Sequence, residues 1–147
     1  MKILGIDPGG TTGVVLVDID FPTATVEIMF AGHVRLWDSL DNIIASKAMR
    51  KVIMERYILR NLGADNEPPI KVIGVVEYLC QLHDMELLLR TPQSRLVIDK
   101  RFPGLLKPHK LGVHAGSAIR HVLTYVYVNN GISNFTLKSD IATTVAK

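Results

Sequence analysis

Cysteine and long apolar segments are scarce in this chain of 147 residues, and each scarcity excludes a class of protein. The single cysteine, Cys80, excludes an internal disulfide and fits a reducing compartment, which predicts a cytoplasmic protein. Its apolar neighbours predict a buried structural thiol rather than a nucleophile. No segment is long and apolar enough to cross a bilayer, and residues 1–4 are too few for a signal peptide, so we expect no membrane partner.

Internal repeats, low-complexity tracts and linkers are also missing, which favours one domain. Hydrophobic residues make up 48% of the chain, enough for a proper core at this length. We expect a domain over residues 1–130 and a polar tail over residues 131–147. The net charge of +3 and the isoelectric point of about 9.1 permit a polyanionic partner but do not require one.

Hydrophobic periodicity predicts an α/β fold with a five-stranded mixed sheet flanked by helices. Short turns join the first three strands, so these should form an antiparallel meander. In the third, Ala24, Val26, Ile28 and Phe30 should share one face. The second helix is apolar over most of its circumference and should be largely buried. The expected strands are Lys2–Ile6, Val14–Ile19, Thr23–Ala31, Lys51–Leu59 and Glu86–Arg90. The expected helices are Leu36–Ala48, Asn66–Asp84, a short one after Thr91-Pro92, and Leu111–Asn130.

A single carboxylate, Asp7, stands between the first predicted strand and a glycine-rich turn. A side chain at the end of a buried strand can leave the core and face a cleft, where a rigid backbone suits a metal ligand. An Asp-Pro-Gly turn whose aspartate bonds to its own backbone explains the same residues equally well. This stretch alone leaves both interpretations open.

Glu55 interrupts an otherwise apolar strand, where a charge is costly without a partner. An ion pair with Arg56 or Arg60, or a strand with one solvent-exposed face, would explain the charge at this position. The pattern favours another interpretation, in which Glu55 and Asp7 lie at neighbouring strand positions and share a cation. Glu77, on the second helix, is a weaker candidate that fits an ordinary polar stripe.

Three polar residues of the last helix, His114, Ser117 and His121, have spacings of three and four and therefore share a face. Two histidines on one face favour a metal or phosphate site only modestly. Basic residues lie just upstream, and a basic corner beside carboxylates fits a phosphodiester backbone as well as an ordinary solvated helix entrance. The candidate nucleic-acid contacts are Lys107, Lys110, Arg120 and His121.

These motifs together resemble the RuvC-like Holliday junction resolvases. The segment Ile6–Gly13, Ile-Asp-Pro-Gly-Gly-Thr-Thr-Gly, is similar to their opening motif, and Glu55 falls where the family has the glutamate of its fourth strand. The segment His114–His121 resembles the last helix, where a His-x-x-Asp or Asp-x-x-Asp pair completes the site. Residues 70–81 and the Thr91-Pro92 turn are similar to small phage-encoded members. The resemblance covers residues 1–128.

The resemblance implies an RNase H-like fold and a homodimer whose two active sites each cut one strand of a four-way DNA junction. It also implies phosphodiester hydrolysis with two Mg²⁺ ions, for which Mn²⁺ can substitute. Asp7 would bridge the ions and Glu55 would bind one of them. His114 would be a ligand or would act on the attacking water.

One position departs from the family pattern, because Ser117 stands where a final acidic residue is expected. Serine is a poor ligand for a hard cation such as Mg²⁺. An engineered, cleavage-dead variant and a natural relative that binds junctions without cutting remain equally open. Asp140 could instead supply the missing charge from the tail, although a tail residue would be poorly fixed.

Two other classes share features with this sequence. The pattern from Asp7 to Gly13 also resembles the phosphate loop of actin-like and sugar kinases, but those proteins need a second domain and a second loop. A non-catalytic nucleic-acid binding protein of the same fold is the stronger alternative because of Ser117. An RNA-processing relative is a further possibility that substrate competition would distinguish.

Overall fold

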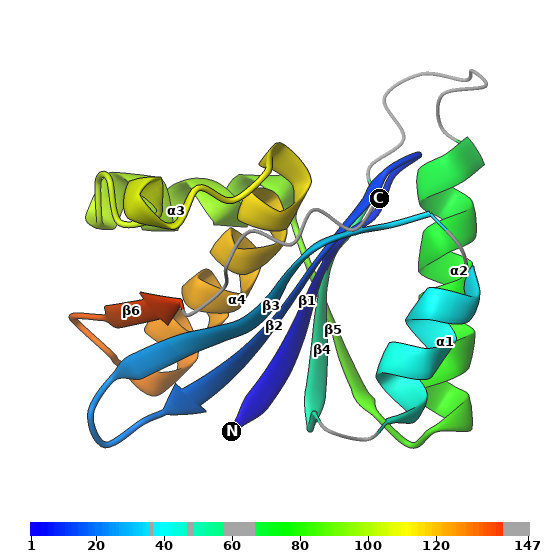
Figure 1. The fold of residues 1–147 in the computed structure, drawn as a ribbon, viewed down its shortest axis with the longest axis horizontal. Coiled ribbons are helices and arrows are strands. Elements are labelled where there is room, and N and C mark those ends of the chain that lie inside the picture. Colours follow the sequence, from blue (N-terminus) through cyan, green and yellow to red (C-terminus); the bar gives the residue numbers. More distant parts are fainter. Residues whose placement is uncertain (36, 47–48, 58–66, 140–147) are drawn as a thin grey trace.

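The computed structural model describes residues 1–35, 37–46, 49–57 and 67–139, which form a six-stranded sheet with helices on both faces (Figure 1). The strands are β1 (Lys2–Asp7), β2 (Thr12–Asp20), β3 (Thr25–Val34), β4 (Lys51–Glu55), β5 (Glu86–Arg90) and β6 (Thr136–Ser139). The helices are α1 (Trp37–Ala45), α2 (Glu67–Leu82), α3 (Arg95–Arg101) and α4 (Val113–Asn130), with short 3₁₀ turns η2 (Pro92–Ser94) and η3 (Lys107–His109).

The strand order is β5-β4-β1-β2-β3-β6. Strands β1, β2 and β3 form the expected antiparallel meander, and β4 and β5 run parallel to β1. The predicted mixed α/β sheet is confirmed, but the predicted strand number of five is wrong. The sixth strand, β6, comes from the predicted tail and pairs in parallel with β3. The sequence of β6, Thr-Leu-Lys-Ser, has no apolar run. The strand is therefore held at the sheet edge by its main-chain pairing with β3.

Most predicted elements match the observed ones to within a few residues, and β5 matches at both ends. The predicted fourth strand, however, ends at Glu55 rather than Leu59. Leu36, Ala48, Leu59 and Asn66, which bounded predicted elements, lie outside the described residues. The last helix ends as expected, because Gly131 adopts a left-handed φ of 63° at its C-terminus.

A bulge reverses the expected alternation in β3. Val26 and Ile28 are buried as predicted, whereas Phe30 is 39% exposed. The β2–β3 register shifts between Leu16 and Val17, so one extra residue of β3 is accommodated there. Because side chains alternate along a strand, that residue moves Phe30 to the other face.

Two clusters of buried apolar side chains pack on the two sides of the sheet. Different helices cover the two faces (Figure 1). Helices α1 and α2 cover one face and bury side chains such as Ile44 and Val76 against β1 and β4. Helix α4, with α3 beyond it, covers the other face and buries Ile119 and Val122 against β1 and β2. The site described below lies on the α4 face.

The second helix is less buried than expected. Its inner side chains, including Val76 and Cys80, are covered, but Ile70, Tyr78 and Leu82 are 48%, 62% and 59% exposed. Only one side of α2 meets the sheet layer, so the other side keeps its apolar residues on the surface. The prediction for Cys80 is confirmed, since its thiol is buried and burial raises its pKa to about 11. Within the described residues, no helix has the length and hydropathy needed to span a membrane.

Candidate active site

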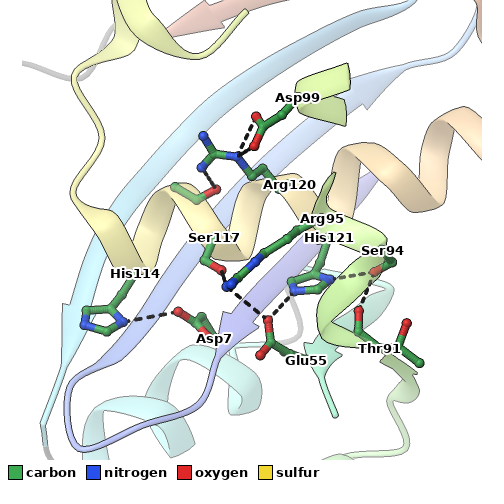
Figure 2. A network of polar contacts seen from close by, with 11 residues as sticks. Asp7, Glu55, Thr91, Ser94, Arg95, Asp99, His114, Ser117, Arg120 and His121 are labelled. Carbon is green, nitrogen blue, oxygen red and sulfur yellow. Dashed lines mark hydrogen bonds and ion pairs between the residues drawn. The ribbon is translucent and has the colours of Figure 1, made fainter. Parts of the chain in front are cut away.

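Asp7 and Glu55 end two neighbouring parallel strands. Strands β1 and β4 are in register at Ile6 and Met54, so the next residue on each strand is one of the two carboxylates. The two acids therefore meet at the carboxyl edge of the sheet, beneath the first half of α4 (Figure 2). Their predicted placement at neighbouring strand positions is observed.

Two glycines allow α4 to approach the sheet closely at this edge. A Cβ atom on Gly5 would lie 2.7 Å from Cγ2 of Val122 and 2.9 Å from the carbonyl oxygen of Ala118. A Cβ atom on Gly13 would overlap the backbone carbonyl of His114. The glycine that ends the opening motif thus brings the first turn of α4 down beside Asp7.

The close approach of α4 brings the His114 side chain within hydrogen-bonding distance of the Asp7 carboxylate. Nδ1 of His114 lies 3.2 Å from Oδ2 of Asp7, and 107 positions separate the two residues in sequence. The turn after β1 is closed separately, because the Thr12 hydroxyl donates to the carbonyl oxygen of Gly9. Asp7 therefore faces α4, whose His114 it contacts.

The surroundings of Asp7 disfavour the charged form of its carboxylate. Burial raises its pKa above the ordinary value, and the nearby Glu55 carboxylate raises the pKa further. The hydrogen bond with His114 and the charges of His114 and His121 act in the opposite direction but do not cancel the rise. A pair of carboxylates that repel each other in a half-buried site is an environment that a cation would stabilise.

Glu55 is held by a chain of hydrogen bonds that begins on η2 (Figure 2). Nε2 of His121 lies 2.7 Å from Oε2 of Glu55. Nδ1 of the same ring lies 2.9 Å from Oγ of Ser94, whose hydroxyl donates to the carbonyl oxygen of Thr91. The His121 ring is 0% exposed, so the prediction that it contacts nucleic acid is wrong. It instead fixes the orientation of Glu55.

Ser117, the residue in the expected acidic position, is paired with a cation. Nη1 of Arg95 donates to Oγ of Ser117 at 3.0 Å and lies 3.7 Å from Oε2 of Glu55. In Figure 2 the Arg95 guanidinium reaches from α3 into the gap between these two side chains. Of the two arginines predicted as possible partners of Glu55, Arg56 is exposed and Arg60 lies outside the described residues.

Several contacts dock α3 onto α4 and so fix the position of Arg95. Nε of Arg120 donates to both carboxylate oxygens of Asp99, at 2.8 and 2.9 Å. The Thr124 hydroxyl donates to the carbonyl oxygen of Ser94 at 2.8 Å. The guanidinium of Arg120 is therefore already engaged within the protein, while its proposed contact with nucleic acid stays a prediction.

The other candidates lie away from the two carboxylates. Lys107 and Lys110 are exposed around η3, just before α4 begins, where they can still meet an extended ligand. Glu77 is exposed on α2, on the opposite face of the sheet, and takes no part in this site. Asp140 lies outside the described residues, so its proposed role is not tested.

Ser94 and Arg95 are site residues that the sequence analysis missed. They follow the Thr91-Pro92 turn, where a proline in the first turn signals a helix start but gives no sign of a function. Only the docking of α3 on α4 brings these residues to Glu55. Long-range contacts of this kind have no local sequence signature.

The donor set suits one hard divalent cation. Asp7 and Glu55 can supply two carboxylates, and Mg²⁺ is commonly bound by one or two carboxylates together with waters and substrate phosphate oxygens. Within the described ranges, no three His, Cys, Asp or Glu side chains lie close enough together to form a complete protein metal cage. A cation here would therefore keep open positions for substrate.

Similar folds are known among solved structures. The Thermus thermophilus RuvC in complex with a Holliday junction substrate aligns with a TM-score of 0.74 at 12% identity, over 90% of this chain and 98% of that one. The fowlpox virus resolvase in complex with Holliday junction DNA aligns with a TM-score of 0.61 at 14% identity, over 88% of this chain and 99% of that one. No protein-family model and no curated protein sequence matches the chain. The likeness confirms the RuvC-like, RNase H-like fold that the motifs implied.

Proposed function

We propose that the protein is a divalent-metal-dependent endonuclease that resolves four-way DNA junctions. The observation that carries this proposal is the meeting of Asp7 and Glu55 on adjacent parallel strands, with His114 from α4 bonded to Asp7. The fold supports the same substrate, because both solved structures described above are junction-resolving proteins bound to such DNA.

Asp7 and Glu55 are the residues that would hold the cation, which we propose to be Mg²⁺ or, as a substitute, Mn²⁺. A bound divalent ion would supply a more acidic water and would stabilise negative charge on the phosphate oxygens. Binding would also relieve the repulsion between the two carboxylates, the repulsion that helps raise the pKa of Asp7.

In this proposal His114 accepts the proton of the attacking water. When Nδ1–H donates to Asp7, the neutral ring keeps an unprotonated Nε2 on a side chain that is 49% exposed. The water oxygen would form a bond to phosphorus as one ester P–O bond breaks. Nε2 would accept a proton from the water, and the leaving oxygen would be protonated from solvent. No protein nucleophile is needed.

Phosphate contacts outside the reacting group would come from the basic surface beside the site. Lys107 begins η3, Lys110 follows it, and both are exposed; Lys100 and Arg101 add charge at the end of α3. Contacts with phosphates position a nucleic acid without reading its sequence, which suits a ligand recognised by its branched shape.

We also propose that the protein acts as a homodimer, because symmetric cutting of a junction requires two active sites. The exposed apolar residues of α2, Ile70, Tyr78 and Leu82, are the candidate contact surface. Light scattering on the purified protein tests this: a dimer whose mass halves on Tyr78→Glu supports the surface, and a monomer in the wild type contradicts the proposal.

A protein that binds junctions without cutting them is the second candidate, and it is favoured by the neutral Ser117 at the expected acidic position. Cleavage of a labelled junction with Mg²⁺ or Mn²⁺, beside a gel shift on the same junction and on a duplex, separates the two. Paired symmetric nicks in the junction alone support the endonuclease. Selective binding without nicks supports the second candidate, and binding of neither DNA directs the search to structured RNA.

A further inference from the structure

The guanidinium of Arg95 contacts both Glu55 and Ser117, the residue that stands where the family pattern has its final acidic side chain. Its Nη1 is 3.0 Å from Oγ of Ser117 and 3.7 Å from Oε2 of Glu55. The side chain of Arg95 is 43% exposed while that of Glu55 is 15% exposed, so the guanidinium spans from the buried carboxylate to the open side of the site.

Contacts between α3 and α4 fix the position of Arg95. Arg95 is the first residue of α3, which is anchored by Arg120 on Asp99 and by Thr124 on the backbone of Ser94. Ser117 is 5% exposed and presents a neutral acceptor to the guanidinium. A carboxylate at position 117 would pair with Arg95, whereas serine leaves the positive charge of Arg95 available to Glu55 and to a ligand.

The balance of charge points to a single divalent ion. With Asp7 and Glu55 ionised, one divalent ion, the Arg95 guanidinium and one phosphodiester bring the formal charge of the site to neutrality. A second divalent ion would leave the site doubly positive, and no group of three or more His, Cys, Asp or Glu side chains that could hold an ion occurs among the described residues. Arg90, the register partner of Glu55 on β5, is outside this sum and makes the surroundings more positive, which disfavours a second divalent ion further.

We propose that the site binds one divalent cation between Asp7 and Glu55, and that Arg95 takes the place of a second one. The guanidinium is a fixed positive charge whose planar fork matches two phosphate oxygens, so it stabilises the charge that develops as the P–O bond breaks. This inference rests on the proposed endonuclease function for its catalytic part. The number of bound cations does not depend on that function.

Electron paramagnetic resonance of Mn²⁺ bound to the purified full chain measures that number directly. We expect one Mn²⁺ per chain in the wild type, with the spectrum of an isolated ion. The double variant Arg95→Gln with Ser117→Asp removes the guanidinium and adds a carboxylate, so it should bind two ions and show a spin-coupled pair. A coupled pair in the wild type would overturn the proposal, as would a double variant that binds only one ion.

Cleavage tests the second part of the proposal. Arg95→Gln should lower the single-turnover rate roughly 100-fold, the scale found when one donor to developing charge is removed, while the Mn²⁺ count and junction affinity stay unchanged. Arg95→Lys keeps the charge and should retain an intermediate rate. Arg50→Gln changes an exposed arginine just before β4, at the opposite end of that strand from Glu55, and is the matched control that should cut like the wild type. Equal rates for Arg95→Gln and Arg50→Gln would contradict the role of Arg95.

The two proposals can fail separately. A wild type that binds one isolated Mn²⁺ but cuts no junction would refute the endonuclease proposal and leave the cation count standing. A wild type that cuts junctions with a spin-coupled Mn²⁺ pair would support the endonuclease and refute the role of Arg95. Melting curves of each variant establish that a lost activity is not a lost fold.

Discussion

Nε2 of His121 lies 2.7 Å from Oε2 of Glu55, although the two residues are 66 positions apart and the histidine is fully buried. Glu55 is the only part of this pair that can face a ligand. His121 therefore acts through Glu55, by fixing the orientation of the carboxylate that we propose as a metal ligand. Such supporting hydrogen bonds are important for metal affinity in other proteins.

Replacing His121 tests this positioning role. His121→Phe keeps a planar ring of similar size but removes the donor, so Mn²⁺ affinity should fall roughly 10–100-fold. His121→Gln retains an N–H donor and should recover part of the loss. Titration calorimetry with Mn²⁺ measures both. Unchanged Mn²⁺ affinity in a folded His121→Phe variant would show that His121 serves the core rather than the site.

The raised pKa of Asp7 predicts how stability depends on pH in the absence of divalent ions. Burial and the Glu55 carboxylate raise this pKa, so the folded protein takes up a proton on Asp7 more readily than the unfolded chain does. The contribution of Asp7 to stability is therefore lost as pH rises from its ordinary pKa of 3.8 through the raised value. Asp7→Asn should melt at a higher temperature than the wild type at neutral pH, and this advantage should shrink as pH falls toward 4.

A divalent cation should reverse that ranking. Binding only to the folded wild type would stabilise it by about 2.7 kcal/mol at a concentration 100 times the dissociation constant. Asp7→Asn lacks one of the two carboxylates and should gain far less. Thermal melts with EDTA and with Mn²⁺, for both proteins, make the comparison. An equal shift in both would place the cation elsewhere.

Gly13 should tolerate no side chain, because a Cβ atom there would overlap the carbonyl of His114. We expect Gly13→Ala to destabilise the protein by about 1–3 kcal/mol and to separate His114 from Asp7, which weakens cleavage as well. Gly74→Ala is the matched control, since nothing lies within 4 Å of a Cβ atom at that exposed position in α2. It should stabilise by roughly 0.5–1 kcal/mol. Chemical denaturation that ranks the two variants in the reverse order would contradict the packing argument.

The features that the sequence predicted best are those with a local signature. The strand that ends at Asp7 and the charge that interrupts the strand at Glu55 are visible in a few neighbouring residues, and parallel pairing then brings them together. The start of a helix at the Thr91-Pro92 turn was also visible. What could not be predicted was the docking of that helix, which carries Arg95 to Ser117.

The errors have a common origin in tertiary context. His121 shares a helix face with His114, and spacing alone does not tell a buried member from an exposed one. β6 joins the sheet through main-chain pairing, and its polar sequence lacks the apolar pattern by which strands are predicted. The bulge opposite Leu16 and Val17 shifts β3 by one residue, and no breaker residue in the sequence marks its position.

The most direct test of the account is single-turnover cleavage of a four-way DNA junction by the wild type and by Asp7→Asn, with Mg²⁺ and with Mn²⁺, beside a gel shift on the same DNA. The account predicts paired symmetric nicks for the wild type. It predicts a loss of roughly 100-fold or more for Asp7→Asn, with junction binding retained, because a charge at the reacting centre is removed while the basic surface is untouched. Equal cleavage by the two proteins would contradict the assignment of the active site.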